Sequence, residues 1–269
     1  MLEVARCTES LVALIGVVSM GIKPSWRRLR ALVITGVAGL VLAAGGALPA
    51  DAGPPSPDRL EVRVQAGAGL APDGQSINVS VLARCPEKWT VQQALVTVAQ
   101  PQASGSASFP LTCTGNFGLA FRVTVPAASG EFELGPAEVT AVVTIKRGRT
   151  EQVQDTRIVD VDPIILVDFG DRMARLRDGG QAVDVDVTVA CPRQTTGLAS
   201  KVFIFQGQVR GVGGFVPVCD GQPHLFTVAV EASDGLFQAG NALVGPSVEI
   251  EFQGERFLFF SNEPIQLVN

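Results

Sequence analysis

Apolar and polar residues alternate along several short segments of the chain. Residues 77–85, INVSVLARC, place an apolar residue or cysteine at every second position, and residues 183–191, VDVDVTVAC, repeat the pattern. A period of two is typical of a β-strand with one buried face, because successive side chains point to opposite sides of the sheet. Turn sequences such as PDGQ, DGGQ and KRGR separate these segments, and no stretch after residue 52 has a convincing helical period. The pattern predicts an all-β fold.

The second half of the chain repeats the first with an offset of 106 residues. Cys85-Pro86 matches Cys191-Pro192, and Cys113-x-Gly115 matches Cys219-x-Gly221. After a one-residue deletion, the segments that begin at Phe121 and Phe226 are identical at nine of nineteen positions. Shared apolar composition would not place cysteines, glycines and phenylalanines in the same order, so the sequence predicts a tandem duplication.

Each copy contains roughly seven short strands separated by turns, which is the strand content of an immunoglobulin-like sandwich. We therefore predict two tandem immunoglobulin-like β-sandwiches, over residues 53–161 and 162–269, after an N-terminal signal peptide over residues 1–52. The connection between them is short, so the last strand of the first copy is expected to lead almost directly into the second.

The first 52 residues have the pattern of a targeting segment. The basic sequence KPSWRRLR precedes an uncharged apolar run from Ala31 to Ala50, and Ala50-Asp51-Ala52 fits the small-x-small rule for cleavage before Gly53. The run is also long enough to span a bilayer, so an uncleaved membrane anchor is the alternative. Translation from Met20 would give an ordinary basic start to the leader, so the true start is expected there.

Charge narrows the range of partners. The whole chain has a formal net charge of −5, and removal of a leader with five basic and three acidic residues leaves −7. An acidic surface repels phosphate backbones, so nucleic acid is not an expected partner. Membrane contact is expected only through the leader, if it stays uncleaved.

Each copy has two cysteines 28 positions apart, Cys85 with Cys113 and Cys191 with Cys219. Exported chains meet oxidising conditions, so we predict two disulfides within the copies, each contributing on the order of 3–4 kcal/mol by restricting the unfolded chain. A metal or redox site is the alternative, but the sequence has no CxxC pair and a single histidine. The spacing is much shorter than that of the disulfide in antibody domains.

The motifs follow the order V-x-C (A-x-C in the first copy), V-x-V-x-Q (V-x-I-x-Q in the second copy), C-x-G, F-x-V-x-V and F-x-x-G-x-A-x-V. This order resembles small secreted domains of actinobacteria, which are exported, disulfide-bonded, immunoglobulin-like β-sandwiches with no assigned function. The resemblance covers both copies, about four-fifths of the chain. It implies fold and location but transfers no active site.

Sequence motifs for catalysis are few. A hydrolytic triad would need His224, which lies in a predicted loop, and the sequence has no GxSxG elbow and no HExxH motif. The glycine-rich segment 211–215, GVGGF, lies between predicted strands and is interpreted as a hairpin loop. Trp89 is the one tryptophan after the leader, which weakens a carbohydrate-binding interpretation.

Aspartates gather where the two copies meet, at positions 155, 160, 162, 168 and 171. Oxygen ligands at such a junction could hold Ca²⁺, with Asp160, Asp162, Asp168 and Asp171 as the candidate ligands. The alternative is that these carboxylates face water and discourage pairing of strand edges. The loose ligand spacing favours the second interpretation, so no metal is expected.

The segment KVFIFQ places Val202 and Ile204 on one face and Phe203 and Phe205 on the other. The matching positions in the first copy hold Thr97 and Ala99. A pair of phenylalanines on the outer face is a candidate protein contact patch. Three phenylalanines near the end of the chain are candidates to extend it: Phe257, Phe259 and Phe260.

These observations favour a secreted, non-catalytic binding or structural module of a bacterial cell envelope or of the extracellular space. The expected partner is a protein or a cell-envelope ligand, and no cofactor is expected. The alternative is a secreted hydrolase or enzyme inhibitor that uses loop carboxylates, because the sequence does not place Asp and Glu pairs in space.

Overall fold

The computed structural model describes residues 59–115 and 118–269. In this part of the chain nearly all regular structure is β-strand, with one short 3₁₀ turn, η1 (Asp178–Gly180), so the predicted all-β fold is confirmed. The described ranges contain no helix with the length and apolar character needed to cross a bilayer. The predicted leader, its cleavage position and the alternative start at Met20 lie outside the described residues.

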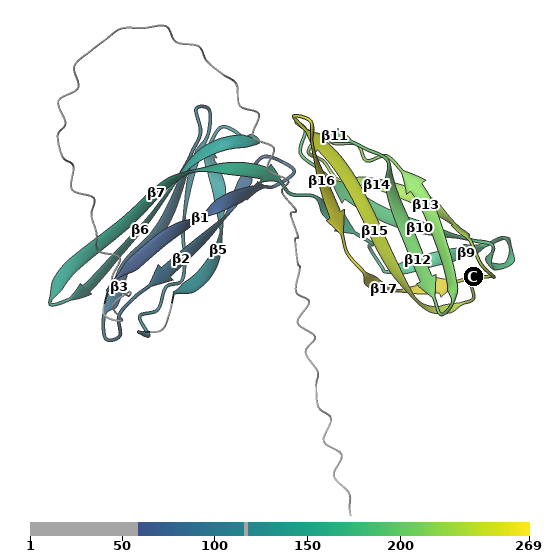
Figure 1. The fold of residues 1–269 in the computed structure, drawn as a ribbon, viewed down its shortest axis with the longest axis horizontal. Helices are drawn as coiled ribbons and strands as arrows, with labels where there is room; N and C mark the ends of the chain where they lie inside the picture. Colours follow the sequence, from purple (N-terminus) through teal and green to yellow (C-terminus); the bar gives the residue numbers. More distant parts are fainter. Residues whose placement is uncertain (1–58, 116–117) are drawn as a thin grey trace, which may run out of the picture. The chain divides into compact units, whose positions relative to one another are not determined.

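Seven strands form the first sandwich (Figure 1). Four of them, in the order β1-β2-β5-β4, and three others, in the order β3-β6-β7, reproduce the two sheets of a constant-type immunoglobulin domain. Pairing of β3 with β4, and parallel pairing of β1 with β7, joins the sheets into a closed circuit. The strands are β1 (Glu61–Leu70), β2 (Ser76–Arg84), β3 (Thr90–Ala99), β4 (Ser104–Ser108), β5 (Leu119–Ser129), β6 (Gly135–Arg147) and β7 (Arg149–Pro163).

The second sandwich has the same circuit, with its first, third and last strands each divided in two. β8 and β9 take the place of β1, and β11 and β12 take the place of β3. β16 and β17 take the place of β7, and β9 pairs with β17 in parallel. The strands are β8 (Leu166–Asp168), β9 (Met173–Arg177), β10 (Ala182–Ala190), β11 (Thr196–Gly197), β12 (Ser200–Gln206), β13 (Val209–Phe215), β14 (His224–Ala232), β15 (Gly240–Phe252), β16 (Glu255–Phe260) and β17 (Glu263–Val268).

Each sandwich has a hydrophobic core of its own, built from the alternating positions. Val79 and Val81 of β2 are fully buried in the first core, as are Val183 and Val187 of β10 in the second. The alternation therefore identifies the buried face of these strands. Burial of one valine side chain contributes roughly 1.5–3 kcal/mol, so these rows account for much of the stability of each sandwich.

Both predicted disulfides are present. Cys85 bonds to Cys113 and Cys191 bonds to Cys219, with Cα–Cα distances of 4.6 and 4.8 Å. Cys85 follows β2 and Cys113 lies between β4 and β5. In the same way, Cys191 follows β10 and Cys219 lies between β13 and β14. The glycine of each C-x-G motif has a positive φ and donates its N–H to the carbonyl oxygen of the partner cysteine, at 3.1 Å in both copies. A left-handed backbone favours glycine at that position, which explains the motif.

Gln100 and Gln206, which end V-x-V-x-Q and V-x-I-x-Q, each hold a loop in place. The Gln100 amide donates to the Glu133 carbonyl and its oxygen accepts from the Glu133 N–H, both at 2.9 Å. Gln206 makes the same two bonds with Gln238, at 2.7 and 2.8 Å. The amide therefore satisfies both backbone groups of a loop residue that pairs with no strand.

The glycine-rich segment GVGGF is part of β13, so its interpretation as a hairpin loop was wrong. A Cβ atom on Gly211 would lie 2.6 Å from the Glu231 carbonyl oxygen, and one on Gly213 would lie 2.4 Å from the Ala229 carbonyl oxygen. The glycines are therefore needed because β13 passes very close to β14.

Candidate functional site

The two phenylalanines of β12 lie on the outer face of the second sandwich, as the alternation predicted. Val202 and Ile204 are fully buried, whereas Phe203 is half-buried and Phe205 is 38% exposed. The Phe203 and Phe205 rings are stacked, with centroids 6.4 Å apart and an angle of 17° between their planes. Their exposed edges face away from the core.

Neighbouring strands extend this surface. Phe203 lies opposite Val212 on β13, and Phe205 lies opposite Leu243 on β15, so these side chains point to the same side of the sheet. On β16, Leu258 and Phe260 lie opposite the outward-facing residues 249 and 247 of β15. We call these residues the outer apolar face: Phe203, Phe205, Val212, Leu243, Leu258 and Phe260.

Gly245 lies between two parts of the outer apolar face. It is on β15 directly opposite Phe203, and a Cβ atom on it would be 2.7 Å from the side-chain oxygen of Asn262, 3.2 Å from the Ser261 carbonyl oxygen and 3.7 Å from an edge atom of the Phe260 ring. The Asn262 side chain therefore covers Gly245, with the Phe260 ring beside it. Phe260 is 57% exposed and Leu258 is 64% exposed, so much of the surface is open to water.

Five of the six equivalent positions in the first sandwich are polar, and the sixth is alanine. By the pairing register, the positions that match the outer apolar face hold Thr97, Ala99, Ser106, Glu138, Gln152 and Gln154. In the same region, the hydroxyls of Thr140 and Thr156 form a hydrogen bond of 2.9 Å across two strands. Since the first sandwich folds with polar or small residues at these positions, the fold itself does not require the phenylalanines of the second.

Charged residues of both signs border the outer apolar face. Lys201 and Arg210 lie on β12 and β13 and are exposed. Glu249 and Glu251 lie farther along β15 and are half-exposed. Lys201 lies opposite Ser247, whose neighbour on the other side is Phe260, whereas Arg210 lies at the other end of the face, opposite Phe205.

Sequence reasoning found only part of this surface. Phe260 belongs to it as expected, but Phe257 and Phe259 pack against the core and do not extend the patch. Val212, Leu243 and Leu258 were missed, because they join the phenylalanines only through cross-strand pairing. Their period-two positions in β13, β15 and β16 were the available signal.

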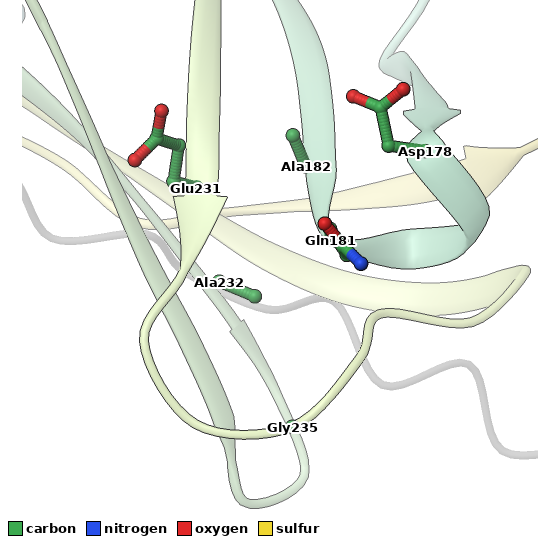
Figure 2. Close-up of a pocket in the computed structure, with 6 residues that line it drawn as sticks. All are labelled: Asp178, Gln181, Ala182, Glu231, Ala232 and Gly235. Carbon is green, nitrogen blue, oxygen red and sulfur yellow. The ribbon is translucent and has the colours of Figure 1, made fainter.

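A polar pocket of about 440 Å³ lies at one end of the second sandwich (Figure 2). Its lining residues are Asp178, Gln181, Ala182, Glu231, Ala232 and Gly235. The two carboxylates lie on opposite sides of Ala182 rather than meeting at one point, and no lining residue is aromatic (Figure 2).

The aspartates considered for Ca²⁺ are spread over several elements. Asp155 accepts hydrogen bonds from a β1 backbone N–H at 2.8 Å and from the arginine two positions later at 3.0 Å. Asp160 and Asp162 lie on β7, Asp168 ends β8, and Asp171 accepts the backbone N–H two residues later. Over residues 59–115 and 118–269, no three metal-ligating side chains form a group.

His224 forms a pair with Asp220, with 2.8 Å between Nε2 and Oδ1. The Gln222 backbone N–H and the imidazole both donate to the Asp220 carboxylate, and these hydrogen bonds lower its pKa. In the described part of the chain, no serine or threonine hydroxyl is hydrogen-bonded to this imidazole. The pair therefore lacks the nucleophile of a hydrolytic triad.

No family model matches the chain, and no curated protein matches it. Among solved structures, Escherichia coli alpha-2-macroglobulin activated by porcine elastase overlaps 78% of this chain at 14% identity and a TM-score of 0.28, and the chain spans 22% of its length. The conserved domain protein from Bacillus anthracis overlaps 77% of this chain and 87% of its own, at 8% identity and a TM-score of 0.26. The fibronectin(III)-like modules of Clostridium thermocellum CbhA overlap 77% and 93%, at 15% identity and a TM-score of 0.24. At these scores the overlaps carry no argument, and the fold assignment rests on the strand order.

Proposed function

We propose that this chain is a secreted, non-catalytic binding module of a bacterial cell envelope or of the extracellular space, and that the outer apolar face is its contact surface. One observation carries the proposal. Five of the six equivalent positions are polar in the first sandwich and all six are apolar in the second, although both have the same strand circuit. Exposed apolar side chains gathered on one face are typical of an interaction site.

We further propose that the two sandwiches arose by tandem duplication, with the division close to residue 162. Strand β10 begins and ends 106 residues after β2, and β15 begins and ends 105 residues after β6. The disulfides and the glutamine bonds recur at the same offsets. The residues that the copies share therefore maintain the scaffold, and function is to be sought where the copies differ.

Export is supported by three features of the chain. Two disulfides persist in oxidising compartments and are rare in the cytosol. The leader has the basic and apolar regions of a signal peptide. The resemblance to secreted actinobacterial domains agrees with both. The alternative, an uncleaved membrane anchor, would keep the same two sandwiches outside the cytosol.

The proposal is tested by capture experiments with the exported protein as bait. Culture supernatant and envelope fractions of the producing bacterium would be passed over the wild type and over a Phe203→Ser, Phe205→Ser variant. Leu225→Ser is the matched control, because Leu225 lies on β14 outside the outer apolar face and is 66% exposed. We expect the wild type and the control to retain the same ligand and the double variant to lose it.

Equal capture by all three proteins would contradict the proposal, because it would show that the outer apolar face is not the contact surface. Melting temperatures and free-thiol titration of each variant verify that the sandwich is intact. Since Val202 and Ile204 form the inner side of β12, the two outward substitutions should leave the core in place.

A further inference from the structure

We infer that a partner protein adds an extended segment as a new strand to the unpaired edge of β16. The segment places apolar residues opposite Leu258 and Phe260 and an acidic residue opposite Arg256. This inference rests on the proposed function, because Leu258 and Phe260 belong to the outer apolar face, and it states how the partner binds there. Three observations carry it: the unpaired edge itself, the backbone groups that point to that edge, and the protection of the equivalent edge in the first sandwich.

β16 has a neighbouring strand on one side only. It pairs with β15 along its whole length, and in the described part of the chain no strand pairs with its other side. The strand that follows, β17, is covered on both sides, because it pairs with β15 and, in parallel, with β9. An unpaired edge presents a row of N–H and C=O groups that an extended peptide can satisfy.

The hairpin between β15 and β16 decides which backbone groups face this edge. Gln253 and Gly254 both have a positive φ, as in a two-residue type I′ turn, and Phe252 lies opposite Glu255. The two residues that flank such a turn are hydrogen-bonded to each other, and hydrogen-bonded pairs then alternate with pairs that are not. Every second residue of β16, beginning with Arg256, therefore points its N–H and C=O to the unpaired edge.

The hydrogen bonds of Glu249 agree with this assignment. Glu249 lies opposite Leu258, and both of its backbone groups bond toward the other side of β15. Its N–H donates to the Ser200 hydroxyl at 3.0 Å, and its carbonyl oxygen accepts from the Leu198 N–H at 2.9 Å. The backbone groups of Leu258 therefore do not face β15.

The equivalent edge of the first sandwich is protected by a charge. By the pairing register, β7 has Glu151 where β16 has Phe257. Glu151 lies opposite the buried Ile145, so its side chain is on the inner side of the strand, where it forms an ion pair with Arg149. An inward-pointing charge at a sheet edge discourages pairing with another strand, because the added strand would remove the charge from water. Phe257 presents no such obstacle.

A second feature covers the first edge and is missing from the second. Asp155 of β7 accepts the Val64 N–H of β1 at 2.8 Å, so its side chain bridges to the neighbouring strand. Ser261 has the corresponding place after β16, and its hydroxyl oxygen is buried without a hydrogen-bond partner among the described residues. β16 therefore lacks both features that protect β7.

The side chains of β16 determine the chemistry of the partner strand. Leu258 and Phe260 are exposed on the outer face, so apolar residues fit directly opposite them, and an acidic residue fits opposite the exposed Arg256. Phe257 and Phe259 point inward and are half-buried, so β-branched residues fit at the two positions between. Antiparallel pairing, the commoner sense, gives the order apolar-x-apolar-x-acidic along the partner.

The experiment is a fluorescence anisotropy titration of a labelled synthetic peptide, SVTITES, with the purified protein. Its valine, isoleucine and glutamate lie opposite Phe260, Leu258 and Arg256. We expect a dissociation constant of roughly 10–300 μM for so short a strand. Absence of binding up to about 1 mM would overturn the inference.

Methylation of the peptide backbone tests the hydrogen bonds separately from the side chains. N-methylation of the valine and the isoleucine removes the N–H groups that bond β16 and should weaken binding at least about tenfold. N-methylation of the two threonines is the matched control, because their N–H groups point away from β16, and it should change binding by less than about twofold. Equal binding of the two methylated peptides would overturn the inference.

Substitutions in β16 test the same bonds from the protein side. Leu258→Pro removes the N–H at the unpaired edge and leaves the bonds between β15 and β16 in place. Leu258→Ser is the matched control, since it removes the same apolar side chain and keeps the N–H. We expect Leu258→Pro to abolish peptide binding and Leu258→Ser to weaken it by less than about tenfold. Equal binding by the two variants would overturn the inference.

Phe257→Glu is an independent variant that copies Glu151 of the first sandwich and leaves the backbone unchanged. It should abolish peptide binding through its inward-pointing charge, and melting temperatures verify that each variant is folded. Wild-type affinity of a folded Phe257→Glu variant would contradict the inference. A second copy of the chain is the competing occupant. Self-association without peptide that Leu258→Pro abolishes would assign the edge to that copy and overturn the inference.

The proposed function and this inference fail separately in the capture experiment. If Leu258→Pro and Leu258→Ser retain the ligand equally while Phe203→Ser, Phe205→Ser loses it, strand addition is wrong and the outer apolar face remains the contact surface. If Leu258→Pro alone loses the ligand and the double phenylalanine variant retains it, the edge of β16 binds the partner and the contact surface proposed above is wrong.

Discussion

Removal of one disulfide at a time should destabilise the two sandwiches separately and by similar amounts. Both disulfides join cysteines with the same sequence separation of 28 residues. The loop-closure entropy for a loop of this length corresponds to about 3.6 kcal/mol at 25 °C. Replacing either pair by alanines should therefore lower the melting temperature of that sandwich by roughly 15–25 °C. Alanine avoids adding a hydroxyl where Cys191 is fully buried and Cys85 is 3% exposed.

Tryptophan fluorescence distinguishes the two transitions. Trp89 packs against the core of the first sandwich and is the one tryptophan after residue 52. Cys85→Ala with Cys113→Ala should shift the fluorescence transition, whereas the equivalent change in the second sandwich should shift only the circular dichroism transition. A loss below about 1 kcal/mol in either sandwich would refute the argument from chain entropy.

Two further predictions concern side chains in the loops. Replacing Gln206 by alanine should lower the free energy of unfolding by about 1–2 kcal/mol in a urea titration, because two hydrogen bonds to a loop backbone are lost. Gln100→Ala should lower it by a similar amount. An unchanged free energy of unfolding for either variant would show that water replaces the amide without loss. Hydrogen bonds from the Gln222 N–H and from His224 lower the pKa of Asp220 below its ordinary 3.8 in the folded state, so its contribution to stability is present above pH 3.8 and is lost as pH falls through the folded pKa. Asp220→Asn should therefore flatten the dependence of melting temperature on pH below about 4, and identical curves for the wild type and the variant would contradict this.

The strand interiors could be predicted from the sequence because alternation reports burial directly. Val202 and Ile204 are fully buried, and the neighbouring phenylalanines face out. The cysteine pairing was also predictable, since each copy offers one pair and export favours oxidation. These features depend on residues close together in the sequence or on a pairing with few alternatives.

The remaining features depend on contacts between distant strands. The glycines of β13 were interpreted as a loop because the sequence does not show how close β13 comes to β14. The residues of β14 that require these glycines lie about twenty positions away in the sequence. Leu243 and Leu258 join the outer apolar face through the register of β15 with β12 and β16. Register is set by turns and by whole-strand packing, so a local pattern gives the face of each residue but not its neighbours across the sheet.

The parallel pairing of first and last strands has a mechanical consequence. In the first sandwich, Ala68, Gly69 and Leu70 of β1 lie beside Val161, Asp162 and Pro163 of β7, and β9 and β17 are paired in the same sense in the second. Tension on the two ends of a sandwich would pull these neighbouring strands in opposite directions along their length. Such a load acts on all the bonds between them at once, whereas peeling breaks them one by one. A tether that carries force would gain resistance to stretching from this feature.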